Sequence, residues 1–132
     1  MPAVLGTDVA IHLRDGDPWV ISQTRGIEPP PFLSAATRVE LENGVWREPE
    51  WSNLRRRALD AMLTFLLTLD FGASEIAAYR TIVESAGFSR RKTADRMTAA
   101  TALAQQLPLV TLNGRDFQDV PGLELVAWER PR

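Results

Sequence analysis

The segment Thr93–Phe117 constrains the fold of this chain more than any other part of it. It reads as a helix of small residues over Ala94–Gln106, then a short apolar strand over Leu109–Leu112, then a turn at Asn113-Gly114. A helix that leads directly into a buried apolar strand is typical of parallel sheets, because parallel strands need long crossover connections and these are usually helices. The segment therefore predicts an α/β fold.

The remainder of the chain repeats this alternation of short apolar runs and helical runs. We expect strands at Ala3–Leu5, Phe32–Ala35, within Leu67–Phe71, and at Leu123–Trp128, and helices at Asp8–Arg14, Pro18–Gln23, Ala36–Trp46, Trp51–Leu67 and Ala73–Ala86. No repeat, low-complexity tract or internal linker interrupts the 132 residues. We therefore expect one domain over 1–132, with helices flanking a mostly parallel central sheet.

Composition excludes several kinds of site. The chain has no cysteine and one histidine, His12, so disulfides, thiolate sites and histidine-based zinc sites are not expected. The net charge of −2 does not indicate a general nucleic-acid binder. The N-terminus lacks the basic region of a signal peptide and no apolar run approaches the length of a membrane span, so we expect a cytoplasmic protein.

Acidic residues fall where the predicted strands end and the helices begin. Asp95 starts the small-residue helix, and Asp116 comes shortly after the strand Leu109–Leu112. Glu40 lies on an earlier helix. Ligands of open parallel sheets collect at the carboxyl ends of the strands, and hard divalent cations prefer oxygen ligands. Each acid also has a simpler role: Asp95 can complement a helix dipole, Asp116 can cap a turn, and Glu40 can be a surface residue.

Four motifs together carry a family resemblance. They are Gly6-Thr7-Asp8, Glu40-Leu41-Glu42-Asn43-Gly44, Ala94-Asp95 through Thr101-Ala102, and Leu109-Val110-Thr111 through Asn113, Asp116 and Phe117. Their order and spacing resemble those of PIN-domain ribonucleases, specifically the VapC-type toxins of bacterial toxin–antitoxin pairs. The resemblance covers nearly the whole chain and implies a PIN-like fold.

The same resemblance implies a metal-dependent endoribonuclease. Glu40, Asp95 and Asp116 would bind Mg²⁺ or Mn²⁺ and activate a water for attack on an RNA phosphodiester, while Thr111 and Asn113 would shape the site by hydrogen bonding. It further implies a small VapB-like antitoxin that packs in a groove formed by the early helices and sends an arginine into the acidic site.

Gly6 departs from the family pattern. Family members carry an aspartate at this position, where it is a direct metal ligand, and glycine offers no side-chain oxygen. Asp8, two residues later, is expected to cap the first helix instead. We therefore expect an impaired nuclease, and favour an engineered inactivation because the other site positions are intact. The alternative is a catalytically silent PIN domain that sequesters an antitoxin or RNA.

Other features give weaker expectations. Arg90, Arg91 and Lys92 directly precede the Asp95 helix and are expected to meet phosphate. A haloacid-dehalogenase-like phosphatase, which also needs an aspartate after the first strand, is a poor alternative because Gly6 removes that nucleophile. The resemblance implies a homodimer, for which Ile76, Tyr79 and Val83 offer a self-complementary face. The four tryptophans are expected mainly in the core, with partial exposure of Trp46 or Trp51 in the antitoxin groove as the alternative; they are Trp19, Trp46, Trp51 and Trp128.

Overall fold

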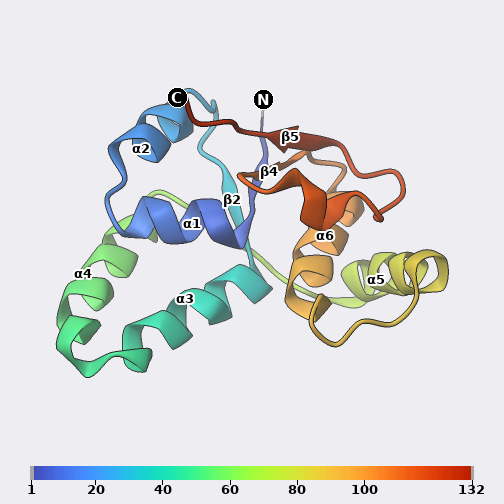
Figure 1. Ribbon diagram of the computed structural model, residues 1–132, viewed down its shortest axis with the longest axis horizontal. Coiled ribbons are helices and arrows are strands. Elements are labelled where there is room, and N and C mark those ends of the chain that lie inside the picture. Colours follow the sequence, from blue (N-terminus) through green and yellow to red (C-terminus); the bar gives the residue numbers. More distant parts are fainter. Residues whose placement is uncertain (1, 132) are drawn as a thin grey trace.

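A five-stranded sheet forms the centre of the computed structural model, which describes residues 2–131 (Figure 1). The strands are β1 (Val4–Leu5), β2 (Phe32–Ser34), β3 (Thr68–Leu69), β4 (Leu109–Thr111) and β5 (Leu125–Ala127). Their spatial order is β3-β2-β1-β4-β5, and every neighbouring pair is parallel. The predicted α/β fold with a mostly parallel sheet is confirmed.

Helices fill the connections between the strands. They are α1 (Thr7–Arg14), α2 (Pro18–Arg25), α3 (Ala35–Arg47), α4 (Ser52–Met62), α5 (Ala73–Ala86) and α6 (Thr93–Gln105), with 3₁₀ turns η1 (Pro49–Trp51) and η2 (Gly114–Phe117). The helix expected over Trp51–Leu67 is shorter than predicted and ends at Met62. Turns follow Met62, in which the Thr64 N–H donates to the Ala61 carbonyl and the Phe65 N–H to the Met62 carbonyl, and the Leu67 carbonyl then accepts a hydrogen bond from the Leu33 N–H of β2.

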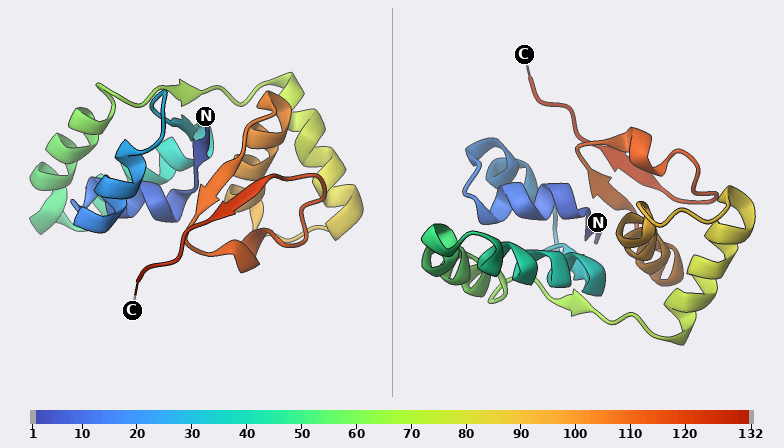
Figure 2. Two further views of the ribbon diagram at one scale, coloured as in Figure 1. Left: turned by 90° about the horizontal axis from the view of Figure 1, so that it is seen from above. Right: turned by 60° about the horizontal axis from the view of Figure 1, so that its bottom comes forward.

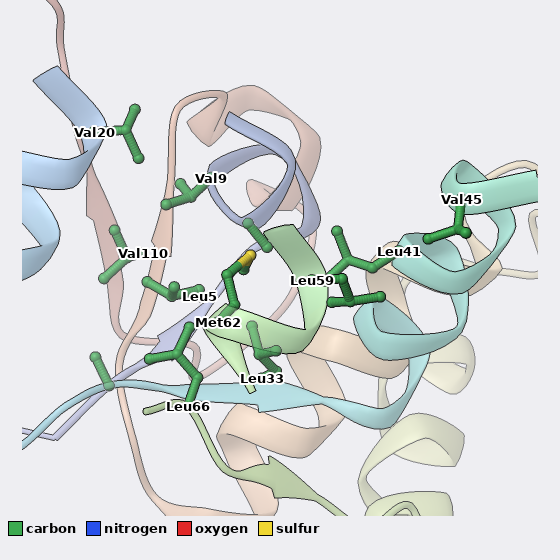
Figure 3. Packing of buried hydrophobic residues seen from close by; sticks show 12 residues of the cluster. Leu5, Val9, Val20, Leu33, Leu41, Val45, Leu59, Met62, Leu66 and Val110 are labelled. Atoms are coloured by element: carbon green, nitrogen blue, oxygen red, sulfur yellow. The ribbon is translucent and has the colours of Figure 1, made fainter. Parts of the chain in front are cut away.

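The two faces of the sheet carry separate cores, because successive strand residues point to opposite faces. Leu5 packs in the first core, between the sheet and α1 to α4, whose side chains are drawn in Figure 3. Val4 packs in the second core, which α5, α6 and η2 complete with Ile82, Ala99 and Phe117. Figure 2 shows α5 lying beside α6 at the edge of this second layer.

Not all predicted core residues are buried. Trp19 and Trp128 contact the first core, with their rings in an edge-to-face arrangement. Trp46 and Trp51 are 72% and 47% exposed, so core packing is wrong for these two tryptophans. Between Pro2 and Pro131, no helix is long and apolar enough to cross a membrane.

Candidate functional site

The carboxyl ends of the central strands meet at one edge of the sheet. Gly6 follows β1 and is the N-cap residue of α1, while Ser34 ends β2 and caps α3 by accepting a hydrogen bond from the Thr37 N–H. Thr111 ends β4, which lies beside β1. Because all these strands are parallel, the starts of α1 and α3 lie at the same edge as the end of β4, where ligands of such sheets bind.

Asp95 lies at this edge, in the first turn of α6. Lys92 is the N-cap of α6, so Asp95 is the third residue of the helix. Burial raises the pKa of the Asp95 carboxyl, and the negative charges of Asp116, Asp8 and Glu40 raise it further. The structure thus brings all four predicted acids within electrostatic reach of one another.

Asp8 bridges two segments of this edge. Its Oδ2 atom accepts hydrogen bonds from the Leu112 N–H at 2.8 Å and the Thr111 hydroxyl at 3.0 Å, and its Oδ1 atom accepts from the Val9 N–H at 2.8 Å. The expectation that Asp8 is the cap of α1 is wrong, because Gly6 occupies the N-cap position. Asp8 instead ties the start of α1 to the end of β4.

The loop after β4 is ordered by its own polar side chains. The Asn113 N–H donates to the Thr111 hydroxyl oxygen at 3.0 Å, and the Asn113 side-chain amide donates to Asp116 Oδ2 at 3.0 Å. These bonds hold the Asp116 carboxylate near the end of β4. Thr111 and Asn113, which were expected to shape the site by hydrogen bonding, form hydrogen bonds within this loop.

Sequence reasoning missed a group of buried hydroxyls beneath this edge. Their side chains are hydrogen-bonded to one another and belong to Thr7, Ser34, Thr37 and Thr98. The available signal was spacing, because Thr37 and Thr98 lie three residues from Glu40 and Asp95 on their respective helices. Residues three apart on a helix share a face, so each threonine lies one turn away from an acid.

The donor set suits a hard divalent cation by its chemistry. The charges of Asp8, Glu40 and Asp116 act on Asp95, and within residues 2–131 no hydrogen bond reaches the carboxylate of Asp95 or Glu40, which leaves their oxygen lone pairs free. Over the same described range, no three acidic or histidine side chains are gathered closely enough to act as a ready ligand set. A cation would therefore have to draw the carboxylates inward.

The basic cluster before α6 is only partly engaged. Lys92 Nζ lies 3.2 Å from Asp119 Oδ2, which also accepts a hydrogen bond from Arg96. The positive charge of Lys92 offsets part of the rise in the pKa of Asp95. Arg90 and Arg91 are exposed, and neither forms an ion pair with a residue in the described part of the chain. The structure places Lys92 near the acids and leaves the two arginines open to solvent.

Comparison with known proteins gives one family and a set of similar folds. The PIN domain family matches residues 3–123. The chain is similar to a chain in the structure of VapBC2 from Rickettsia felis bound to a DNA fragment from its promoter, with a TM-score of 0.84, 25% identity, and coverage of 98% of this chain and 100% of that one. No curated protein matches the sequence at a significant level.

Two further structures share the fold at lower identity. DNA-bound VapBC from Salmonella typhimurium matches with a TM-score of 0.84 and 20% identity, covering 97% of this chain and 99% of that one. FitAcB from Neisseria gonorrhoeae matches with a TM-score of 0.78 and 23% identity, covering 95% and 96%. The chain therefore spans nearly the full length of the chains that it resembles.

Proposed function

The chain belongs to the PIN domain family, and from this premise we propose that it is the toxin of a toxin–antitoxin pair, a metal-dependent endoribonuclease of the VapC type. The observation that carries the proposal is that the negative charges of Asp8, Glu40 and Asp116 all act on the carboxylate of Asp95. Like charges repel one another, so a cluster of carboxylates that is costly on its own is typical of a site that binds a cation.

The proposed cation is Mg²⁺ or Mn²⁺, held by Glu40, Asp95 and Asp116. When bound, such a cation stabilises negative charge that develops on a phosphoryl oxygen. Asn113 would orient Asp116 for this role through the hydrogen bond at 3.0 Å. Asp95, whose pKa is already raised, would be held ionised by the opposite charge.

The substrate is proposed to be RNA, approached through its phosphates. The exposed guanidinium groups of Arg90 and Arg91 precede α6, and a guanidinium fork fits a phosphate well. Lys92 is paired with Asp119, so its contribution would be a nearby positive charge rather than a free donor. The overall charge of −2 is consistent with a local phosphate contact rather than a broad basic surface.

The antitoxin is proposed to pack in a groove between α1, α2 and α4. This groove has a volume of about 510 Å³, and its walls are mostly apolar, including Leu13, Ile21, Met62 and Leu66. Phe65, which also lines it, is 73% exposed although it is large and apolar. An exposed apolar surface of this kind suits an amphipathic segment of a partner, with burial supplying most of the binding energy.

Gly6 supports a second candidate function. A PIN domain without a carboxylate at this position has one fewer charged oxygen ligand for a cation, so it would be impaired as a nuclease. It would still bind an antitoxin through the α1, α2 and α4 groove. We keep this silent binding module as the alternative, and favour an impaired nuclease because the other acids are retained.

The proposed function is tested by RNA cleavage with purified protein. We expect weak cleavage that requires Mn²⁺ or Mg²⁺, stops with chelator, and is lost in Asp95→Asn. The matched control is Asp70→Asn, which changes an exposed aspartate just after β3 and should leave cleavage unchanged. Cleavage that survives both chelator and Asp95→Asn would contradict the proposal. No cleavage, together with retained antitoxin binding, would favour the silent module.

A further inference from the structure

The hydroxyl groups beneath the acidic edge form a connected chain. Thr98 Oγ1 lies 2.8 Å from Ser34 Oγ and 3.4 Å from Thr37 Oγ1, and Ser34 donates to Thr37 at 3.0 Å. Thr37 Oγ1 lies 2.8 Å from Thr7 Oγ1. Ser34, Thr37 and Thr98 are at most 1% exposed, so this contact between α3 and α6 is polar although it is buried.

Each hydroxyl belongs to a segment that also carries an acid. Thr98 is one turn after Asp95 on α6, and Thr37 is one turn before Glu40 on α3. Thr7 directly precedes Asp8. The hydroxyl chain therefore joins the starts of α1, α3 and α6, the three helices that carry Asp8, Glu40 and Asp95.

A buried hydroxyl chain fixes its neighbours more strictly than an apolar contact would. A hydrogen bond depends on direction as well as distance, and a buried hydroxyl that loses its partner costs about 1–3 kcal/mol. A fully bonded network thus specifies one relative placement of its helices. Asp95 and Glu40, which carry like charge, need such an external constraint because they repel each other.

We propose that Thr98, with Thr37 and Ser34, is a positioning residue that sets the placement of Asp95 relative to Glu40 for a shared divalent cation. The inference rests on the proposed function for the identity of that cation. The hydroxyls themselves do not bind the ion; they act through the two helices that carry the carboxylates.

The test replaces Thr98 by valine, which has nearly the same shape and lacks the hydroxyl. The matched control is Thr101→Val, because Thr101 is also fully buried on α6 but, among residues 2–131, its hydroxyl bonds only to the Met97 carbonyl of its own helix, at 2.9 Å. Thr98→Ser keeps the hydroxyl and serves as the rescue variant. Mn²⁺ affinity is measured by titration calorimetry, and the metal-free crystal structure of each variant gives the separation of the Asp95 and Glu40 carboxylates.

We expect Thr98→Val to weaken Mn²⁺ binding by about 10- to 100-fold, the range typical for loss of a group that orients metal ligands. The carboxylate separation should change in the same variant, while Thr98→Ser and Thr101→Val keep both properties. Equal affinity and equal separation in Thr98→Val and Thr101→Val would overturn the proposal.

The structural readout separates this proposal from the proposed function. If the unchanged protein bound no Mn²⁺ but the carboxylates moved only in Thr98→Val, the positioning role would stand and the metal role would fail. If Thr98→Val did not fold, Thr37→Val would test the same contact between α3 and α6 from the side of α3. A folded Thr37→Val with unmoved carboxylates would also overturn the proposal.

Discussion

The Oδ1 atom of Asp8 lies 2.8 Å from the point that a Cβ on Gly6 would occupy. The Val110 carbonyl oxygen lies 3.0 Å from the same point. The Asp8 carboxylate is held there by hydrogen bonds to Val9, Thr111 and Leu112. A side chain at position 6 therefore has to displace Asp8, so an aspartate cannot be placed there without a further adjustment.

This crowding shapes the outcome of restoring a carboxylate at position 6. Gly6→Asp should raise Mn²⁺-dependent RNA cleavage, and Gly6→Asp combined with Asp8→Ser should raise it further, because serine removes both the crowding oxygen and a repelling charge. We expect a gain of about tenfold or more in the double variant, which corresponds to about 1.4 kcal/mol of added transition-state stabilisation. Cleavage rates measured with and without chelator decide the matter. Equal, chelator-sensitive rates with glycine and with aspartate would show that Gly6 is not the defect.

The sequence predicted the fold and the positions of the acids because both depend on local pattern. Alternating apolar strands and helices dictate a parallel sheet, and such a sheet gathers its strand ends at one edge. The sequence did not predict that Asp8 reaches the end of β4, because that bond joins residues more than a hundred positions apart. Core burial was favoured for Trp46, which is 72% exposed, because helical spacing does not tell which face of α3 is covered.

Burial and charge repulsion at Asp95 predict a gain in stability on neutralisation. Both raise the pKa of its carboxyl in the folded state, so the ionised carboxylate destabilises the metal-free fold at neutral pH. This cost shrinks as the pH falls through the raised folded-state pKa and is gone below the ordinary value of 3.8. Asp95→Asn should therefore melt a few degrees higher than the unchanged protein at pH 7 without metal. The difference should vanish near pH 3. A lower melting temperature for Asp95→Asn at pH 7 would show that the carboxylate is not under electrostatic stress.

Blocking the groove between α1, α2 and α4 should prevent antitoxin binding. Ala61 lines this groove and is itself exposed, so Ala61→Arg adds bulk and charge without disturbing the core. The matched control is Ala77→Arg, an exposed alanine on α5. Co-expression with a VapB-like antitoxin, which we expect to be encoded immediately upstream, followed by a pull-down, should recover the Ala77→Arg chain and not the Ala61→Arg chain. Equal recovery of both would place the antitoxin elsewhere.

The exposed face of α5 should mediate a homodimer. Ile76 is 56% exposed, and Tyr79 and Val83 are partly exposed on the same helix. We expect light scattering to give about twice the chain mass of 14.7 kDa, and Ile76→Asp to give the monomer. Ser85→Asp, on the same helix, is the control and should remain dimeric. A monomer in the unchanged protein at high concentration would argue against this face.

Calorimetric titration of the metal-free protein with Mn²⁺ tests most directly whether Glu40, Asp95 and Asp116 form one cation site. We expect the unchanged protein to bind a single cation weakly, Asp95→Asn and Glu40→Gln to lose this binding, and Asp70→Asn to keep it. The same binding curve for Asp95→Asn and Asp70→Asn, or no heat of binding in the unchanged protein and in Gly6→Asp with Asp8→Ser, would show that these carboxylates do not form a cation site.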